Sequence, residues 1–404
     1  MKSVDFNSVV HFLEGPGVRK WQFKTSGIKL INIRNIVNSE INLSNTDKHL
    51  SIEEVERKYK HFLLEEGDYI MASSGATWGK IAEVKKEHLP LCLNTSIIKL
   101  KSINGELHNR FLWHFINSIE FTKQIDRLIT GSAQPNFGPS HLNKIKIPLP
   151  PPKAQKKIAN ILDSNDGYKQ KTRALIDKYE ELAQSLFLDM FGNPVSNQKN
   201  WKVKKLKDIT TKIGSGNTPK GGSNVYVSEG ITFFRSQNVW KNRIELDDVA
   251  FIDQATHDKM TRSSLKHKDI LMTKTGRINT ENSSLGRAAM YLGGDDKANV
   301  NGHVYLIRPK EDVIGEFVLF ILTTIQYRDY IRRVCVGGID KRQLNKDHLE
   351  EFPIIYPPIE SQKRFVKILK EIESQIALAE QSLKKSEDLF NSLLQKAFKG
   401  ELVQ

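Results

Sequence analysis

Cysteine is nearly absent from this chain: its 404 residues include two, Cys92 and Cys335, at non-equivalent places in the repeat described below. They predict neither a disulfide framework nor a cysteine-based metal site. Uninterrupted apolar runs of about 18 residues are also absent, and the N-terminus lacks the basic-then-apolar layout of a signal peptide. We therefore expect a cytoplasmic protein that does not interact with membranes.

Nucleotide- and metal-binding motifs are missing too. The eleven histidines show no His-Glu-x-x-His spacing, and we expect His141 and His348 to be structural. The run from Gly75 to Ile81 resembles a P-loop, but one residue is missing between the glycines and Ile81 replaces the Ser or Thr that would hold magnesium. A methyltransferase would need a glycine-rich cofactor loop and an Asn- or Asp-Pro-Pro-aromatic motif, and neither occurs. We predict no metal site in this chain.

One set of acidic residues resembles a nuclease motif. Asp68, Glu83 and Lys85 follow the Asp…Glu-x-Lys order by which many nucleases hold a metal. The matching region of the second half has Asp269, but Ala289 stands where the glutamate would be. We expect a surface strand here, and no catalytic residue.

The chain does contain a long internal repeat. Residues 131–155 match residues 338–362 at a constant offset of 207, with glycine, His-Leu, Pro-Pro and glutamine in common. Earlier segments match at offsets of 201 to 207, as insertions in loops would produce. A period this long indicates a whole domain plus connector present twice, and not a solenoid repeat.

Positive charge is concentrated in two parts of the repeat. The formal net charge is +14, of which residues 1–150 carry +5 and residues 194–357 carry +7, while residues 151–193 and 358–404 carry +1 each. This distribution favours two polyanion-binding bodies joined by nearly neutral interaction segments. Simple solubility is the alternative explanation.

After each Pro-Pro the pattern becomes helical. Apolar residues at three- and four-residue spacing predict two long helices that pack side by side as a coiled coil, with a distortion near Gly167 in the first. A helix of this length measures about 55–60 Å, which would set the distance between the two polyanion-binding bodies. The first predicted seam is Ile158, Ile161, Asn165, Tyr168, Thr172, Leu175, Tyr179, Leu182 and Leu186. The second is Phe365, Leu369, Ile372, Ile376, Ala379, Leu383, Ser386, Phe390, Leu393 and Ala397.

The parts before each Pro-Pro show a mixed pattern. Short β-branched and aromatic runs predict strands at 27–36, 67–74, 91–101, 230–240, 268–276, 286–294 and 302–310. Amphipathic segments predict helices at 51–64, 108–129 and 316–334. Each globular part is therefore expected to be a mixed α/β body with a modest sheet.

Both halves also place polar, amide and basic residues at a turn and at a glycine loop after a strand. Such loops can offer backbone N–H groups and cations to phosphates, and Arg, Asn and Gln to base edges. The candidate DNA-binding residues are Arg34, Asn35, Ser73, Ser74, Thr77, Lys80, Arg235, Gln237, Asn238, Lys274, Thr275, Arg277, Asn279 and Arg287. A polar turn that meets only water is the alternative for any one of them.

Several motifs resemble the specificity subunit of type I restriction-modification enzymes. They are Gly131-Ser-x-Gln134, the run from Pro148 to Gln155, the helix ending at Pro194, Trp201, the run from Pro357 to Gln362, and Phe398-Lys-Gly-Glu-Leu402. The likeness spans essentially the whole chain. Ala154 and Ser361 depart from it, since the family usually has glutamate there.

The resemblance implies two target recognition domains, 1–150 and 194–357, separated by two antiparallel conserved helices, 151–193 and 358–404. Each domain would read one half of a bipartite double-stranded DNA target. This chain would be non-catalytic and bind no cofactor; two modification subunits would supply S-adenosylmethionine chemistry, and restriction/translocase subunits would add ATP- and magnesium-dependent steps. Candidate partner-binding residues on the helices are Tyr168, Leu175, Tyr179, Leu182, Leu186, Leu369, Ile372, Ile376, Leu383, Phe390 and Leu393.

Two alternatives stay open at this point. The chain could be a stand-alone or fused DNA methyltransferase or nuclease with an unrecognised active site. It could also be a coiled-coil scaffold with incidental basic domains, which would bind DNA weakly and without sequence preference.

Overall fold

A computed structural model describes residues 2–44, 46, 48–75, 78–129, 136–277, 283–338 and 341–402. The chain forms two compact units. Unit 1 consists of residues 1–174 together with 379–404, and unit 2 of residues 175–378. Because both long helices are divided between the units, the four-part division at 150, 193 and 357 stays a prediction.

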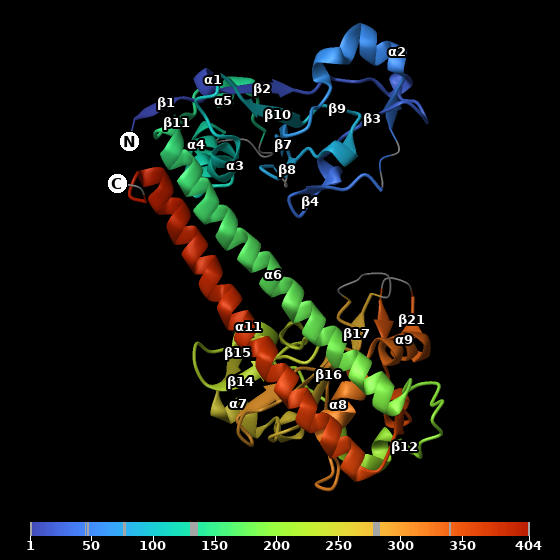
Figure 1. Cartoon of the computed structure of the whole chain (residues 1–404). Helices are drawn as coiled ribbons and strands as arrows, with labels where there is room; N and C mark the ends of the chain where they lie inside the picture. Colours follow the sequence, from blue (N-terminus) through green and yellow to red (C-terminus); the bar gives the residue numbers. More distant parts are fainter. Residues whose placement is uncertain are drawn as a thin grey trace. The chain divides into compact units, whose positions relative to one another are not determined.

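Unit 1 is built on a four-stranded antiparallel sheet in the order β2-β10-β7-β8. A smaller sheet in the order β6-β3-β9 pairs β3 with β9 in parallel, and β1-β11 and β4-β5 are two-stranded. Figure 1 shows these strands in blue and teal. Their bounds are β1 Ser3–Asp5, β2 Val10–Glu14, β3 Ile28–Leu30, β4 Ile36–Val37, β5 Glu40–Ile41, β6 His49–Leu50, β7 Tyr69–Ala72, β8 Ile81–Glu83, β9 Leu91–Cys92, β10 Ile97–Ser102 and β11 Lys146–Pro148.

The helices of unit 1 are α1 Phe6–Val9, α2 Ile52–Glu54, α3 Asn109–Ile116, α4 Ile119–Leu128, α5 Pro139–Leu142 and the start of α6 Pro152–Phe191. The predicted helix over 51–64 continues after α2 as a π turn, Val55–Tyr59, and a 3-10 turn, Lys60–Phe62. The single helix predicted over 108–129 is wrong: it is two helices, because the Ser118 hydroxyl caps α4 by accepting the Phe121 N–H.

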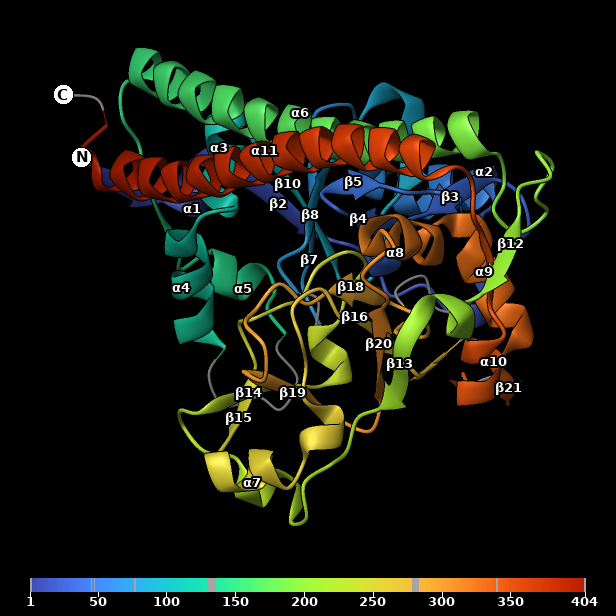
Figure 2. The same ribbon diagram turned by 90° about the horizontal axis from the view of Figure 1, so that it is seen from below.

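Unit 2 has its own four-stranded antiparallel sheet, β13-β20-β16-β18, and a three-stranded sheet, β15-β14-β19, in which β14 and β19 are parallel. A further small sheet, β17-β22-β21, and the pair β12-β23 complete it (Figure 2). The bounds are β12 Val203–Lys205, β13 Thr210–Ser215, β14 Ile231–Phe234, β15 Ala250–Ile252, β16 Ile270–Thr273, β17 Thr275–Gly276, β18 Ala288–Met290, β19 Ala298–Val300, β20 Val304–Pro309, β21 Val336–Gly337, β22 Arg342–Gln343 and β23 Pro353–Ile355.

The helices of unit 2 are α7 Gln254–Asp258, α8 Gly315–Thr323, α9 Ile325–Val334, α10 Lys346–Glu350 and the start of α11 Ile359–Lys399. Here too the predicted helix over 316–334 is two helices, with Thr324 capping α9. Three sheets of unit 1, β1-β11, β2-β10-β7-β8 and β6-β3-β9, therefore have counterparts with the same strand order in unit 2, while β4-β5 is matched there by the isolated bridge between Val239 and Ile244. The predicted duplication and the mixed α/β class are confirmed.

The two long helices pack against each other within each unit. In unit 1, Asn165 of α6 accepts a hydrogen bond from Ser386 of α11 at 3.3 Å. In unit 2, Phe187 of α6 meets Phe365 of α11 with ring centroids 5.4 Å apart. Early α6 thus meets late α11 in unit 1, and late α6 meets early α11 in unit 2, so the pairing is antiparallel.

The seam predicted for α11 is confirmed, since every one of its ten residues is buried or half-buried. The seam predicted for α6 is partly wrong. Tyr168, Leu175 and Leu182 are 50%, 44% and 51% exposed. Ile158 and Thr172 of the predicted seam are buried, and Leu162, Lys169, Ala183 and Phe187 are buried although the predicted seam omits them. Helix α6 is continuous through Gly167, so there is no break at this residue, and a bend there stays a prediction.

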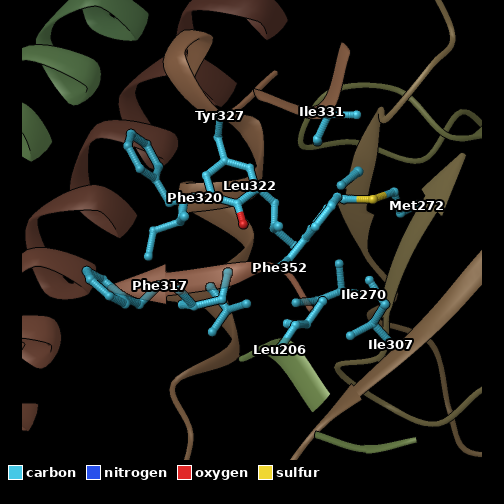
Figure 3. Packing of buried hydrophobic residues seen from close by; sticks show 14 of the residues in the cluster. Leu206, Ile270, Met272, Ile307, Phe317, Phe320, Leu322, Tyr327, Ile331 and Phe352 are labelled. Carbon is cyan, nitrogen blue, oxygen red and sulfur yellow. The ribbon is translucent and has the colours of Figure 1, made fainter. Parts of the chain in front are cut away.

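Each unit has a core that is completed by the far end of a long helix. In unit 2, Phe187 and Phe191 of α6 pack on Phe317, and Figure 3 shows the neighbouring cluster around Phe352 and Tyr327. In unit 1, Phe398 of α11 packs on Phe111 and Phe115 of α3, with centroids 5.3 and 5.4 Å apart. Burial of such rings contributes about 2–3 kcal/mol each.

A charged contact also ties each globular part, residues 1–150 and 194–357, to the long helix that follows it. In unit 1, Arg110 of α3 binds Asp163 of α6 through Nε and Nη2, and His114 contacts the same carboxylate at 2.8 Å. In unit 2 the charges are reversed, because Glu316 of α8 pairs with Lys370 of α11 at 3.1 Å. The ion pair thus lies at equivalent positions in the two units, but the basic and acidic residues are exchanged between the two helices.

Among the described residues, no helix is both long enough and apolar enough to cross a membrane.

Candidate nucleic-acid interface

The first part of the candidate site is a one-turn 3-10 helix, Ile33–Asn35, after β3. The Asn35 side chain accepts the Asn32 N–H at 2.9 Å, and it donates to the Asn42 carbonyl at 2.8 Å and the Thr46 hydroxyl at 2.9 Å. Asn35 is 1% exposed. It therefore holds the turn, and the prediction that it pairs with a base is wrong, because all its amide atoms are engaged inside the protein.

Unit 2 repeats this turn at Ser236–Asn238. The Asn238 side chain accepts the Arg235 N–H at 2.9 Å and donates to the carbonyls of Glu245 and Asp248. It is also 1% exposed, so it too is structural and not a base reader. Asp248 additionally receives hydrogen bonds from the side chains of Arg235, at 3.0 Å, and Gln237, at 2.6 Å.

The second part of the candidate site follows the central strand of each sheet. In unit 1 the Ser73 N–H donates to the Ser96 carbonyl, and the Ser73 carbonyl accepts from Phe137. In unit 2 Lys274 makes the same two bonds, to His303 and from Leu344. The matching bonds place Ser73 and Lys274 at equivalent positions, at the foot of the two glycine loops.

Exposure separates the remaining candidates into three groups. Arg34, Lys80, Gln237 and Arg277 are exposed; Ser74, Arg235, Lys274 and Thr275 are half-buried; Ser73 and Arg287 are buried. Thr77 and Asn279 lie outside the described residues. The exposed group can meet a ligand directly, and for those residues DNA contact stays a prediction.

Two of the basic candidates in unit 2 have pKa values that burial lowers. Burial lowers the pKa of Lys274, whose Nζ donates to Ser215 at 3.2 Å and lies 4.9 Å from the Tyr305 ring centroid. Burial likewise lowers the pKa of Arg287, whose Nε donates to the Ser283 carbonyl. An added anion would stabilise the charged form of the half-buried Lys274, which suits a phosphate.

Arg287 is better described as a packing residue than as a DNA contact. It is 8% exposed, and its guanidinium lies 3.8 Å from the centroid of the Trp240 indole. Trp240 and Asp248 were not among the predicted site residues. An alignment of the two turns could have identified Trp240, since it occupies the position of Val37, two residues after the turn asparagine.

The nuclease-like carboxylates do not converge. Asp68 is fully buried and accepts the Glu65 N–H at 2.8 Å, while Glu83 pairs with Arg110 and Lys85 with Glu40. Over the parts of the chain that the structure describes, no group of three or more His, Cys, Asp or Glu could hold a metal ion. The His141 ring accepts the Gly138 N–H at 3.1 Å, in agreement with a structural role.

These features define a class of protein: a duplicated α/β chain with two equivalent polar turn-and-loop surfaces. The model of the type I restriction modification DNA specificity domain matches residues 7–178 and 198–387. The chain therefore belongs to that family, and each match covers one copy of the repeat.

Two specificity subunits are similar to this chain over most of its length. The chain is 24% identical over 353 residues to the type I restriction enzyme MjaVIII specificity subunit of Methanocaldococcus jannaschii, covering 83% of this chain and 80% of the relative. It is 22% identical over 357 residues to the EcoKI specificity subunit of Escherichia coli K12, covering 83% and 75%.

Solved structures share the fold. A chain from a type I restriction-modification system superposes with a TM-score of 0.57 at 17% identity, covering 99% of this chain and 98% of the other. The S subunit of such a system from M. genitalium gives 0.55 at 16% identity, covering 98% and 96%.

Proposed function

We propose that this chain is the DNA sequence-specificity subunit of a type I restriction-modification complex. Each recognition part reads one half of a bipartite double-stranded target. One observation carries the proposal: the two units keep the same strand order and the same buried asparagine turn, while the side chains displayed around that turn differ. A common scaffold with different exposed groups suits two different half-sites.

The proposal assigns the chemistry to partner subunits. Modification subunits would carry S-adenosylmethionine, and restriction/translocase subunits would use ATP and magnesium; the chain itself would bind none of these. The names of its relatives, all specificity subunits, support this division of labour. A cytoplasmic location stays a prediction.

The long helices are the proposed docking place for two modification subunits. Tyr168, Leu175 and Leu182 recur every seven residues along α6, and all three are exposed. Repeated exposed apolar residues on one helix favour contact with another protein. The predicted residues Leu369, Ile372, Ile376, Leu383, Phe390 and Leu393 are turned into the seam instead, so they would act by holding the helices together.

The deciding experiment is methylation in a cell. The chain is co-expressed with a cognate modification subunit in a methylation-deficient host, and the genome is sequenced with detection of methyladenine. We expect one bipartite motif that disappears when either subunit is omitted. A contiguous palindrome would contradict the two-reader proposal, and methylation or cleavage of DNA by the purified chain alone would establish the enzyme alternative.

A further inference from the structure

Unit 1 has a surface hollow beside its asparagine turn. The hollow measures about 610 Å³, and its walls include Arg34, Ile36, Val37, Lys80, Thr95 and Ser96. These residues come from the turn, from β4, from the end of the glycine loop and from the β9–β10 loop. Lys80 and Thr95 are exposed, so a cation and a hydroxyl are accessible from solvent at this place.

Backbone hydrogen bonds identify the same place in unit 2. The Ala72 N–H donates to the Lys80 carbonyl at 2.8 Å, and the Thr273 N–H donates to the Arg287 carbonyl at 2.9 Å. Lys80 and Arg287 are therefore equivalent. Val37 and Trp240 are equivalent because each stands two residues after the turn asparagine.

In unit 2 this place is occupied by a side chain of the protein. The Trp240 ring lies on the Arg287 guanidinium at 3.8 Å, and its Nε1 donates to the Gln237 carbonyl at 2.9 Å. Stacking of an indole on a guanidinium is favourable and covers the cation. Val37 is too small to do the same for Lys80, so in unit 1 the equivalent space is left open.

The walls of the open hollow suit one kind of ligand. Lys80 and Arg34 supply positive charge, Thr95 supplies a hydroxyl, and Ile36 and Val37 supply an apolar wall. Cations and hydroxyls bind phosphate oxygens, whereas an apolar wall packs against a deoxyribose ring. Resting on the proposed function, we propose that the hollow of unit 1 seats one sugar-phosphate unit of the DNA backbone, and that Trp240 and Arg287 close the equivalent seat in unit 2.

The consequence is that the two recognition parts hold DNA unequally. The part in unit 1 makes a backbone contact that the part in unit 2 lacks. Since phosphate contacts fix register and carry no sequence information, this contact adds affinity at the first half-site without changing which bases are read there.

The test uses two variants of the full chain, assembled with modification subunits. Lys80→Gln removes the cation, and Val37→Trp introduces the indole that fills the space in unit 2. Lys123→Gln, an equal loss of charge at an exposed position on α4, is the matched control. Dissociation constants are measured from 50 to 300 mM NaCl on a duplex carrying the methylated motif and on duplexes with either half-site scrambled, and circular dichroism melts check folding.

For Lys80→Gln we expect about tenfold weaker binding and a salt slope reduced by about one, with the preference for the correct first half-site unchanged. Val37→Trp should weaken binding in the same way. The idea is overturned if both variants behave like Lys123→Gln, or if they lose base preference with an unaltered salt slope, which would make the hollow a base reader. If the wild-type complex shows no preference for the motif duplex, the proposed function fails instead.

Discussion

The turn asparagines illustrate how one residue type serves two purposes. Asn35 and Asn238 were predicted to pair with bases because amides read adenine, yet each is buried and makes three internal hydrogen bonds. The residues beside them, Arg34 and Gln237, have exposed side chains. Under the proposed function, base preference at these turns would come from the exposed neighbours of the asparagines.

Replacing Asn238 with alanine should lower stability. The change removes three hydrogen bonds and leaves the Arg235 N–H and the Glu245 carbonyl without their partner, while the Asp248 carbonyl keeps its bond from the Arg235 guanidinium. The expected cost is about 2–3 kcal/mol of unfolding free energy. Denaturant unfolding measures this. Gln237→Ala, at an exposed position with one bond to Asp248, should cost less than about 1 kcal/mol; equal losses in the two variants would show that Asn238 does not hold the turn.

His114 should make unit 1 sensitive to acid. Burial lowers its pKa below the usual 6.5, with the hydrogen bond to Asp163 opposing the shift. The imidazole of His114 therefore binds a proton more readily in the unfolded chain than in the folded chain. The stability that neutral His114 contributes is therefore fully present above about pH 6.5. It is lost as the pH falls toward the lower pKa that His114 has in the folded protein.

A phenylalanine at position 114 tests this, since unit 2 has Phe320 at the equivalent place. Chemical unfolding of wild type and His114→Phe is compared between pH 7.5 and 5.5. The wild type should lose more stability over this range than the variant does. Parallel losses in both proteins would contradict the assignment.

At the scale of whole elements, the sequence predicted strands better than helix faces. Each predicted strand contains a strand of the structure, because short β-branched runs between turn residues have few other conformations. The two helix breaks were missed, since Ser118 and Thr324 look like ordinary helix-surface residues until their hydroxyls are seen to cap α4 and α9.

The face of α6 was misjudged for a physical reason. Tyr168, Leu175 and Leu182 form a regular heptad row that predicts a seam, but they are exposed, and Lys169, which the predicted seam omits, is buried. Lys169 buries its aliphatic stem and places its ammonium 3.7 Å from the Phe390 ring centroid, in a salt bridge with Asp166. A pattern of hydrophobic residues alone does not predict that a lysine buries its aliphatic stem in a helix seam.

Two variants on α6 separate the predicted face from the observed one. Phe187→Ala should lower stability by about 3–5 kcal/mol, because the ring is fully buried against Phe191, Phe317, Phe320 and Phe365. Leu182→Ala, with half of the side chain exposed, should cost less than about 1 kcal/mol. Thermal and denaturant unfolding measure both, and a larger loss for Leu182→Ala would restore the predicted seam.

At the scale of the whole molecule, the sequence predicts the duplication. It does not predict which segments of the chain make up each unit. Matched Pro-Pro and His-Leu positions reveal two copies. They contain no information on which helix end completes which core, because the ends of α6 and α11 are both apolar and aromatic. Only the contacts of Phe187 and Phe398 decide it.

The charge of the two recognition parts predicts the salt dependence of DNA binding. Residues 1–150 and 194–357 carry +5 and +7. Affinity for a scrambled duplex should fall at least about 100-fold between 50 and 200 mM NaCl, as counterion release requires, while the ratio of specific to scrambled affinity stays large. Fluorescence anisotropy measures both. Salt-insensitive binding without preference would favour the scaffold alternative.

The core of unit 1 contains the last residues of the described chain. Leu394 and Ala397 of α11 are buried there, and Phe398 packs on α3, although α3 lies nearly three hundred residues earlier in the sequence. During translation, Phe111 and Phe115 are therefore made before their packing partner Phe398, because the whole of unit 2 lies between them in the sequence. A ribosome that stalls late, or a protease that removes the final helical turns, would damage the half of the protein that was made first.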